Sequence, residues 1–90
     1  MLPIAGAEAA LPPYWQRAQE VRDIVASQDV YEKVRQSPID RIERVGNDLY
    51  RIEAGKCRLE VRIVDLPDSQ PPGFVGPRRF RIVAGEPDCR

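Results

Sequence analysis

The sequence predicts an α+β domain in which an N-terminal helix, expected to kink, packs on one face of a three- to four-stranded antiparallel β-meander. Two observations lead to this fold class. Apolar residues recur at helical spacing over residues 14–25, and they alternate with charged residues over 50–63 and 78–84. The chain of 90 residues, 42% of them hydrophobic, fits one small domain, which we place at residues 13–90.

Residues 1–12 are expected to be either a disordered tail or the remnant of a secretion signal. The segment 5–9, AGAEA, contains two small-x-small patterns of the kind that signal peptidases cut. Glu8 and the short apolar run instead favour a disordered tail. Pro12 and Pro13 then place proline in the first turn of the predicted helix.

The predicted helix carries an apolar stripe that we expect to face the sheet. Its members are Tyr14, Ala18, Val21 and Val25, with Ile24 beside them. After residue 26 the stripe moves to the opposite side of the helix. A kink or restart at residues 27–29 explains this shift, because serine and aspartate are good N-cap residues.

The first predicted strand is residues 39–45, a segment whose apolar spacing also suits a helix. The turn cluster Gly46-Asn47-Asp48 favours the strand, because a three-residue hairpin loop would match apolar residues across the turn. The expected pairs are Val45 with Leu49 and Ile42 with Ile52.

The next hairpin follows from strict alternation on both sides of Gly55-Lys56, a dipeptide that suits a type II′ turn. A two-residue loop sets every apolar residue opposite an apolar one, and a slip by one residue would set apolar against charged. The expected pairs are Ala54 with Cys57, Ile52 with Leu59, and Tyr50 with Val61. On the other face, Arg51 lies opposite Glu60 and Glu53 opposite Arg58.

The two cysteines are expected to meet at one end of this sheet. In one register of the last strand, residues 78–84, Ile63 lies opposite Phe80 and Cys57 opposite Glu86. In a register shifted by two, Cys57 lies opposite Asp88, and both bring Cys89 close. A Cys57–Cys89 disulfide would indicate a periplasmic or secreted protein. The alternative is a cytoplasmic protein in which Cys57 is a buried apolar residue and Cys89 a free thiol.

Four arginines are the first candidate binding residues. In the first register Arg62 faces Arg81, and Arg78 and Arg79 lie close by. Like charges set opposite one another cost stability, so this corner could bind an anion, a phosphate backbone or an acidic partner. The alternative interpretation is ordinary surface charge.

Three apolar residues are further candidates for contact with a partner. Phe74 and Val75 lie between two glycines in the proline-rich segment 66–77, where they could present a recognition site or cover the end of the sheet. Trp15 lies off the helical stripe. It could contact a partner, but in a small domain we expect it to complete the core.

The composition argues against several functions. There is no histidine, the two cysteines are far apart, and the chain has neither a nucleophile elbow nor a glycine-rich phosphate loop. We therefore expect no enzyme, no cofactor and no metal site. Equal numbers of basic and acidic residues argue against nucleic acid, and no segment is apolar enough to span a membrane. The expected function is a small non-enzymatic binding domain, exported and disulfide-linked, with a protein or peptide as partner.

One resemblance gives an alternative function. Residues 46–62, GNDLYRIEAGKCRLEVR, are similar to the central strand pair of RelE/ParE-type toxins, in which a Leu-Tyr-Arg run follows a helical hairpin. The resemblance implies an intracellular protein directed at RNA or DNA. It would make Arg58, Arg62 and Arg81 the RNA-contacting candidates.

Overall fold

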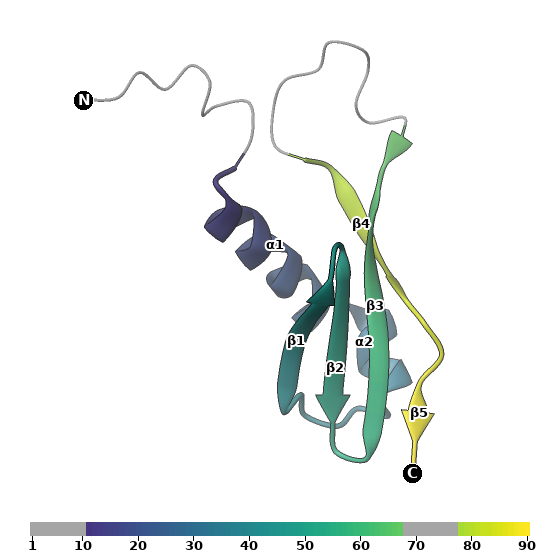
Figure 1. Ribbon diagram of the computed structural model, residues 1–90. Coiled ribbons are helices and arrows are strands. Elements are labelled where there is room, and N and C mark those ends of the chain that lie inside the picture. Colours follow the sequence, from purple (N-terminus) through teal and green to yellow (C-terminus); the bar gives the residue numbers. More distant parts are fainter. Residues whose placement is uncertain (1–10, 68–77) are drawn as a thin grey trace, which may run out of the picture.

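A computed structural model describes residues 11–67 and 78–90, which form two helices and a five-stranded antiparallel sheet (Figure 1). Strands β1 to β4 follow one another across the sheet, and β5 pairs with the start of β3. This arrangement confirms the α+β prediction. The elements are α1 (Pro13–Val25), α2 (Gln28–Lys33), β1 (Arg41–Gly46), β2 (Leu49–Ala54), β3 (Cys57–Asp65), β4 (Phe80–Ala84) and β5 (Asp88–Cys89). Residues 1–10 of the predicted tail lie outside the described part.

The helical region is interrupted where the sequence predicts a restart. Proline occupies the first turn of α1 at Pro13, and α1 ends at Val25. Ser27 is then the N-cap of α2, and its hydroxyl accepts a hydrogen bond from the Val30 amide at 3.1 Å. In Figure 1, α2 lies behind the sheet while α1 projects past the β1–β2 turn.

The β2–β3 hairpin has the predicted register. Ala54 pairs with Cys57, Ile52 with Leu59, and Tyr50 with Val61. Gly55 has φ +60°, as the first position of a type II′ turn requires. A Cβ at this position would also lie only 3.1 Å from the Ser37 hydroxyl oxygen, so both backbone and space favour glycine here.

The β1–β2 hairpin confirms the strand prediction but corrects its turn. Ile42 pairs with Ile52 as expected. Gly46, and not Val45, pairs with Leu49, and an irregularity between Arg44 and Gly46 leaves Val45 36% exposed. The predicted Val45–Leu49 pair is therefore wrong. The turn is tighter than predicted because Asp48 adopts a left-handed conformation with φ 56°, which aspartate tolerates.

The last strand adopts the register that is shifted by two residues. Ile63 pairs with Ile82 and Arg62 with Val83, so the predicted Ile63–Phe80 and Arg62–Arg81 pairs are wrong. Both registers keep apolar residues on one face, and hydropathy alone does not separate them. One additional residue between β4 and β5 then brings Cys89, rather than Asp88, opposite Cys57.

The predicted disulfide joins Cys57 and Cys89. It holds β5 against the first residues of β3, where the Arg90 amide also donates to the Lys56 carbonyl at 3.1 Å. From α2, the Lys33 ammonium donates to the Ala84 and Gly85 carbonyls at 3.3 Å each. The irregular connection between β4 and β5 is therefore held from both sides.

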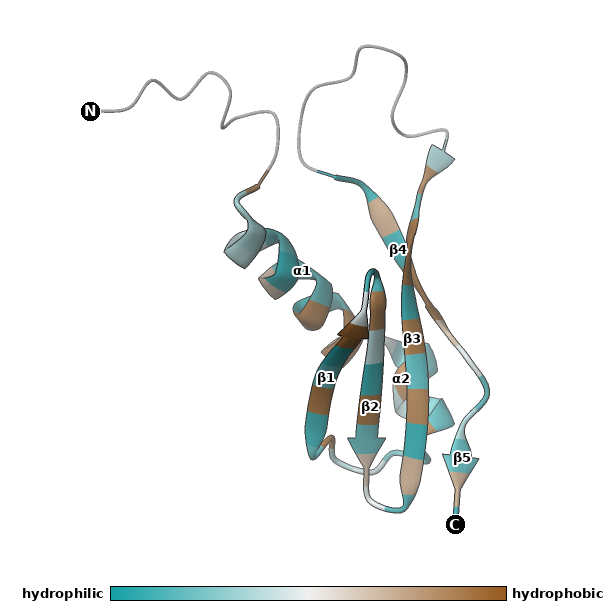
Figure 2. Cartoon of the chain, viewed as in Figure 1, coloured by the Kyte–Doolittle hydropathy of each residue, from teal (hydrophilic) through white to brown (hydrophobic). Residues whose placement is uncertain are grey.

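The core lies between the inner face of the sheet and the two helices. Figure 2 shows hydrophobic and hydrophilic residues alternating along β3, as expected for a sheet with one buried face. The buried apolar residues are Ile24 from α1, Val30 and Val34 from α2, and Tyr50, Ile52, Ala54, Cys57, Leu59, Val61 and Ile63 from the sheet.

The face of α1 that packs on the sheet differs from the predicted one. Glu20 and Ile24 are its buried residues, and Val21 packs at the margin of the core. Tyr14 is 73% exposed and Val25 54% exposed, so their assignment to the core is wrong. Trp15, which was expected to complete the core, is 59% exposed. The helix is rotated toward Glu20 because that carboxylate has partners inside the domain.

Removal of the disulfide should destabilise the domain strongly. For Cys57→Ala/Cys89→Ala we expect the free energy of unfolding to fall by about 3–4 kcal/mol, because the bond closes a long loop in the unfolded chain. Urea denaturation followed by circular dichroism measures the change. Wild-type protein kept in reductant should unfold at nearly the same urea concentration as the variant, and equal stability with and without reductant would contradict the prediction.

Candidate functional site

The candidate arginines Arg62 and Arg81 lie on the outer face of the sheet and are exposed. Arg62 lies between Leu49 and Val83, and Arg81 lies opposite Val64. The two arginines are thus diagonal neighbours separated by valines, rather than a directly opposed pair. Arg79, the residue before β4, is also exposed.

Arg78 has a different environment from the other three candidates. Its guanidinium donates to both carboxylate oxygens of Asp48, at 2.9 and 3.2 Å, and to Asp65. A third carboxylate, Glu20, lies 3.8 Å away. The hydrogen bonds to Asp48 and Asp65 raise the pKa of Arg78, and Arg78 in turn lowers the pKa of Asp48 through its hydrogen bonds. From the segment just before β4, Arg78 therefore joins α1, the β1–β2 turn and β3 to one another.

Glu20 is a buried carboxylate, although it lies outside the apolar stripe that the sequence predicts to face the sheet. Only 5% of the residue is exposed, and its oxygens accept hydrogen bonds from the Tyr50 hydroxyl at 2.6 Å and the Gln16 amide at 2.9 Å. Burial, together with the hydrogen bond to Glu20, raises the pKa of Tyr50 to about 12. Tyr50 was the one feature of the sequence that pointed to a buried polar partner, because a tyrosine at a buried strand position needs a hydrogen-bond partner for its hydroxyl.

On the outer face of β2 and β3, basic and acidic side chains lie opposite one another in pairs. The predicted cross-strand pairs form ion contacts, at 3.7 Å between Arg51 and Glu60 and 3.9 Å between Arg58 and Glu53. Further rows repeat the alternation, with Glu43 opposite Arg51 and Arg58 opposite Asp88. Arg58, a candidate RNA contact from the toxin resemblance, therefore has a carboxylate partner.

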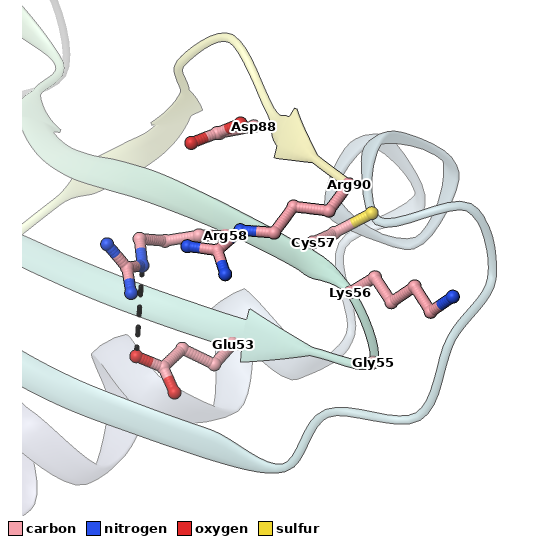
Figure 3. A pocket seen from close by; sticks show the side chains of 7 residues that line it. All are labelled: Glu53, Gly55, Lys56, Cys57, Arg58, Asp88 and Arg90. Atoms are coloured by element: carbon pink, nitrogen blue, oxygen red, sulfur yellow. Dashed lines mark ion pairs between the residues drawn. The ribbon is translucent and has the colours of Figure 1, made fainter.

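A pocket of about 390 Å³ lies beside the disulfide, at the end of the sheet (Figure 3). Its lining mixes charges of both signs: Glu53, Gly55, Lys56, Cys57, Arg58, Asp88 and Arg90. Figure 3 shows Arg90 extending toward Arg58, whereas Lys56 points away from both. The mixture of cations and carboxylates gives this pocket no clear preference for a charged ligand.

The helix α1 carries an exposed apolar surface. Tyr14, Ala18, Val21 and Val25, here called the α1 stripe, border a hollow of about 560 Å³. The other lining residues are Pro13, Arg17 and Arg22. The Trp15 ring packs edge-on against the Tyr14 ring, with 4.8 Å between ring centroids. The sequence pattern located this stripe but predicted that it faces the sheet.

The candidate residues and the possible metal ligands can be located only within the described part of the chain. Phe74 and Val75 lie outside residues 11–67 and 78–90. Within those two ranges, cysteine and carboxylate side chains form no group of three or more that could hold a metal ion. Neither described helix has the length and apolar character needed to cross a membrane.

Comparison with known proteins gives no relative. The sequence matches no protein-family model, no curated protein and no solved structure. Function is therefore inferred from the geometry of the chain itself.

The Tyr50–Glu20 hydrogen bond should make stability sensitive to alkaline pH. The folded pKa of Tyr50, about 12, lies above its usual value near 10, so its contribution is complete below about pH 10 and is lost as pH rises through about 12. For Tyr50→Phe we expect a loss of about 1–2 kcal/mol at neutral pH, because a buried carboxylate loses one donor. We also expect a flatter decline between pH 10 and 12.

Urea unfolding of both proteins at a series of pH values tests this expectation. Tyr31→Phe is the matched control, because Tyr31 is 48% exposed and the same hydroxyl is removed from the surface. If Tyr50→Phe and Tyr31→Phe lose stability equally at neutral pH, the hydrogen bond to Glu20 has no stabilising role.

Proposed function

We propose that this chain is a small non-enzymatic domain that binds a protein or peptide through the α1 stripe, and that it works in a periplasmic or secreted setting. The observation that carries the proposal is the exposure of large apolar side chains on one short helix. Tyr14, Trp15 and Val25 are each more than half exposed, while the core of the same domain is closely packed.

Exposed apolar residues that occur singly are ordinary, but a contiguous group on one element favours a binding surface. The α1 stripe is contiguous, because its members follow one another at helical spacing along the full length of α1. Trp15, which packs against Tyr14, extends it at the N-terminal end. Aromatic residues of this kind are enriched at the energetic centres of protein interfaces.

Tyr14 and Val25, at the two ends of the stripe, contribute little to the folding of the domain, and this supports a role in binding. The core is built from the inner sheet face, α2, and the Glu20–Ile24 side of α1. Tyr14 and Val25 have no place in that core. Side chains that are costly to expose and unnecessary for folding are best explained by a partner that covers them.

The extracytoplasmic setting is supported by the disulfide. Structural disulfides persist in oxidising compartments and are rare in the cytosol of mesophiles. The bond closes the end of a sheet in a chain of only 90 residues, which has little core to stabilise it otherwise. A non-enzymatic role is supported by the absence of histidine from the sequence and by the mixed charge of the pocket at the disulfide.

Selection from a displayed random-peptide library tests the proposed surface. Peptides enriched on the wild-type domain should lose at least about tenfold in affinity for Val25→Glu, because the substitution puts a charge into an apolar contact. Val25 is 54% exposed, so the variant should keep the wild-type circular dichroism spectrum and urea midpoint. Fluorescence polarisation with the enriched peptides measures the affinities.

Arg62→Glu/Arg81→Glu is the matched control, because it changes exposed residues on the sheet face away from α1. Peptide affinity should be unchanged in that variant. If the affinity of the enriched peptides is instead unchanged for Val25→Glu and falls for the arginine variant, the outer sheet face is the binding surface and our proposal is wrong.

A further inference from the structure

We infer that the partner of the α1 stripe is an amphipathic α-helix whose apolar seam is bordered by acidic side chains. This inference rests on the proposed function and adds the chemistry and shape of the ligand. It is carried by the arrangement of six of the seven residues that line the hollow on α1.

These lining residues form two successive diamonds on the helix surface. Residues at spacings of three, four and seven enclose one depression on an α-helix, and such a depression accepts one side chain of a facing helix. The first diamond is Tyr14, Arg17, Ala18 and Val21, and the second is Ala18, Val21, Arg22 and Val25. The hollow on α1 therefore has the layout of two adjacent holes for the knobs of another helix.

The small side chain of Ala18 gives the surface its concave form. Ala18 belongs to both diamonds, and larger side chains, among them Tyr14 and Val25, stand around it. A ridge would suit insertion into a lipid surface, whereas a row of holes suits the interdigitation of side chains. The shape therefore favours a helix over a membrane.

Two arginines beside the α1 stripe indicate which charge a partner should carry. With about 100° of rotation per residue, Arg17 and Arg22 fall on opposite sides of the α1 stripe. Neither forms an ion pair within the described residues, and none of the described residues that line the hollow is a carboxylate. Residues that flank the apolar seam of paired helices select partners by charge. A partner helix should thus carry glutamate or aspartate on both sides of its seam.

The same charges oppose the pairing of two copies of this chain. An α1 helix facing a second α1 helix would bring arginine flanks against arginine flanks on both sides of the seam. Like charges in such positions are destabilising. The fitted partner is therefore a different chain, whose apolar residues recur every three to four positions over about 16 Å of helix.

Two designed helical peptides test the inference directly. Both carry leucine at seam positions three and four apart over four helical turns, and they differ only in having glutamate or lysine at the flanking positions. The wild-type domain should bind the glutamate peptide at least about tenfold more tightly than the lysine peptide, as measured by fluorescence polarisation at low salt. Higher salt should reduce the difference.

Charge reversal on α1 should reverse this preference. Arg17→Glu/Arg22→Glu is expected to bind the lysine peptide more tightly than the glutamate peptide. Arg22→Glu alone, which lies farther from the buried Glu20, should reduce the preference several-fold if the double variant does not fold. Lys56→Glu is the control for net charge, because Lys56 is exposed at the far hairpin and should leave the preference intact.

Four results would overturn the inference. The first is equal binding of the two designed peptides, and the second is binding of neither. The third is binding to phosphatidylcholine–phosphatidylglycerol vesicles that Val25→Glu abolishes. The fourth is self-association in sedimentation that Val25→Glu abolishes. If library peptides still depend on Val25 while the designed peptides show no charge preference, the proposed binding surface stands and only the partner chemistry fails.

Discussion

The hydrogen bond between Tyr50 and Glu20 determines which side of α1 meets the sheet. Glu20 is 5% exposed, and a buried carboxylate is costly unless its oxygens are paired. Tyr50, Gln16 and Arg78 supply that pairing from β2, from α1 itself and from the segment just before β4. The α1 stripe lies roughly a third of a turn away from Glu20 on the same helix. With Glu20 facing Tyr50, Tyr14 and Val25 of the stripe are turned away from the sheet, while Val21 stays at the margin of the core.

The two ends of the sheet are held by different chemistry. At one end the disulfide fixes β5 to the first residues of β3, beside the β2–β3 turn. At the other end Arg78 links Asp48 in the β1–β2 turn, Asp65 at the end of β3, and Glu20 in α1. The bidentate contact with Asp48 has the planar geometry that makes arginine suited to carboxylates. A covalent bond at one end of the sheet and ion pairs at the other thus stabilise a domain that has only a small core.

The sequence predicts those parts of the fold for which the pattern of apolar and charged residues is compatible with a single arrangement. The β2–β3 register follows from alternation and the turn at Gly55, and the Ser27 cap follows from the shift of the helical stripe. Prediction fails where two solutions share a pattern. Both registers of β4 keep apolar residues inward, and Val45 can either pair or bulge. The hydropathy pattern also could not predict which side of α1 faces the sheet, because that depends on Glu20, a buried residue of a type that is usually exposed.

Separate faces of one helix serve the folding and the proposed binding. Glu20 and Ile24 connect α1 to the core, while Tyr14 and Val25 project from it. A substitution in the α1 stripe can therefore change affinity with little effect on stability, whereas a change at Glu20 would alter the orientation of the whole surface. Because the contacts of Glu20 exist without a partner, the surface is formed before binding. Preorganisation of this kind lowers the entropic cost of association, which is consistent with a short helix as the proposed partner.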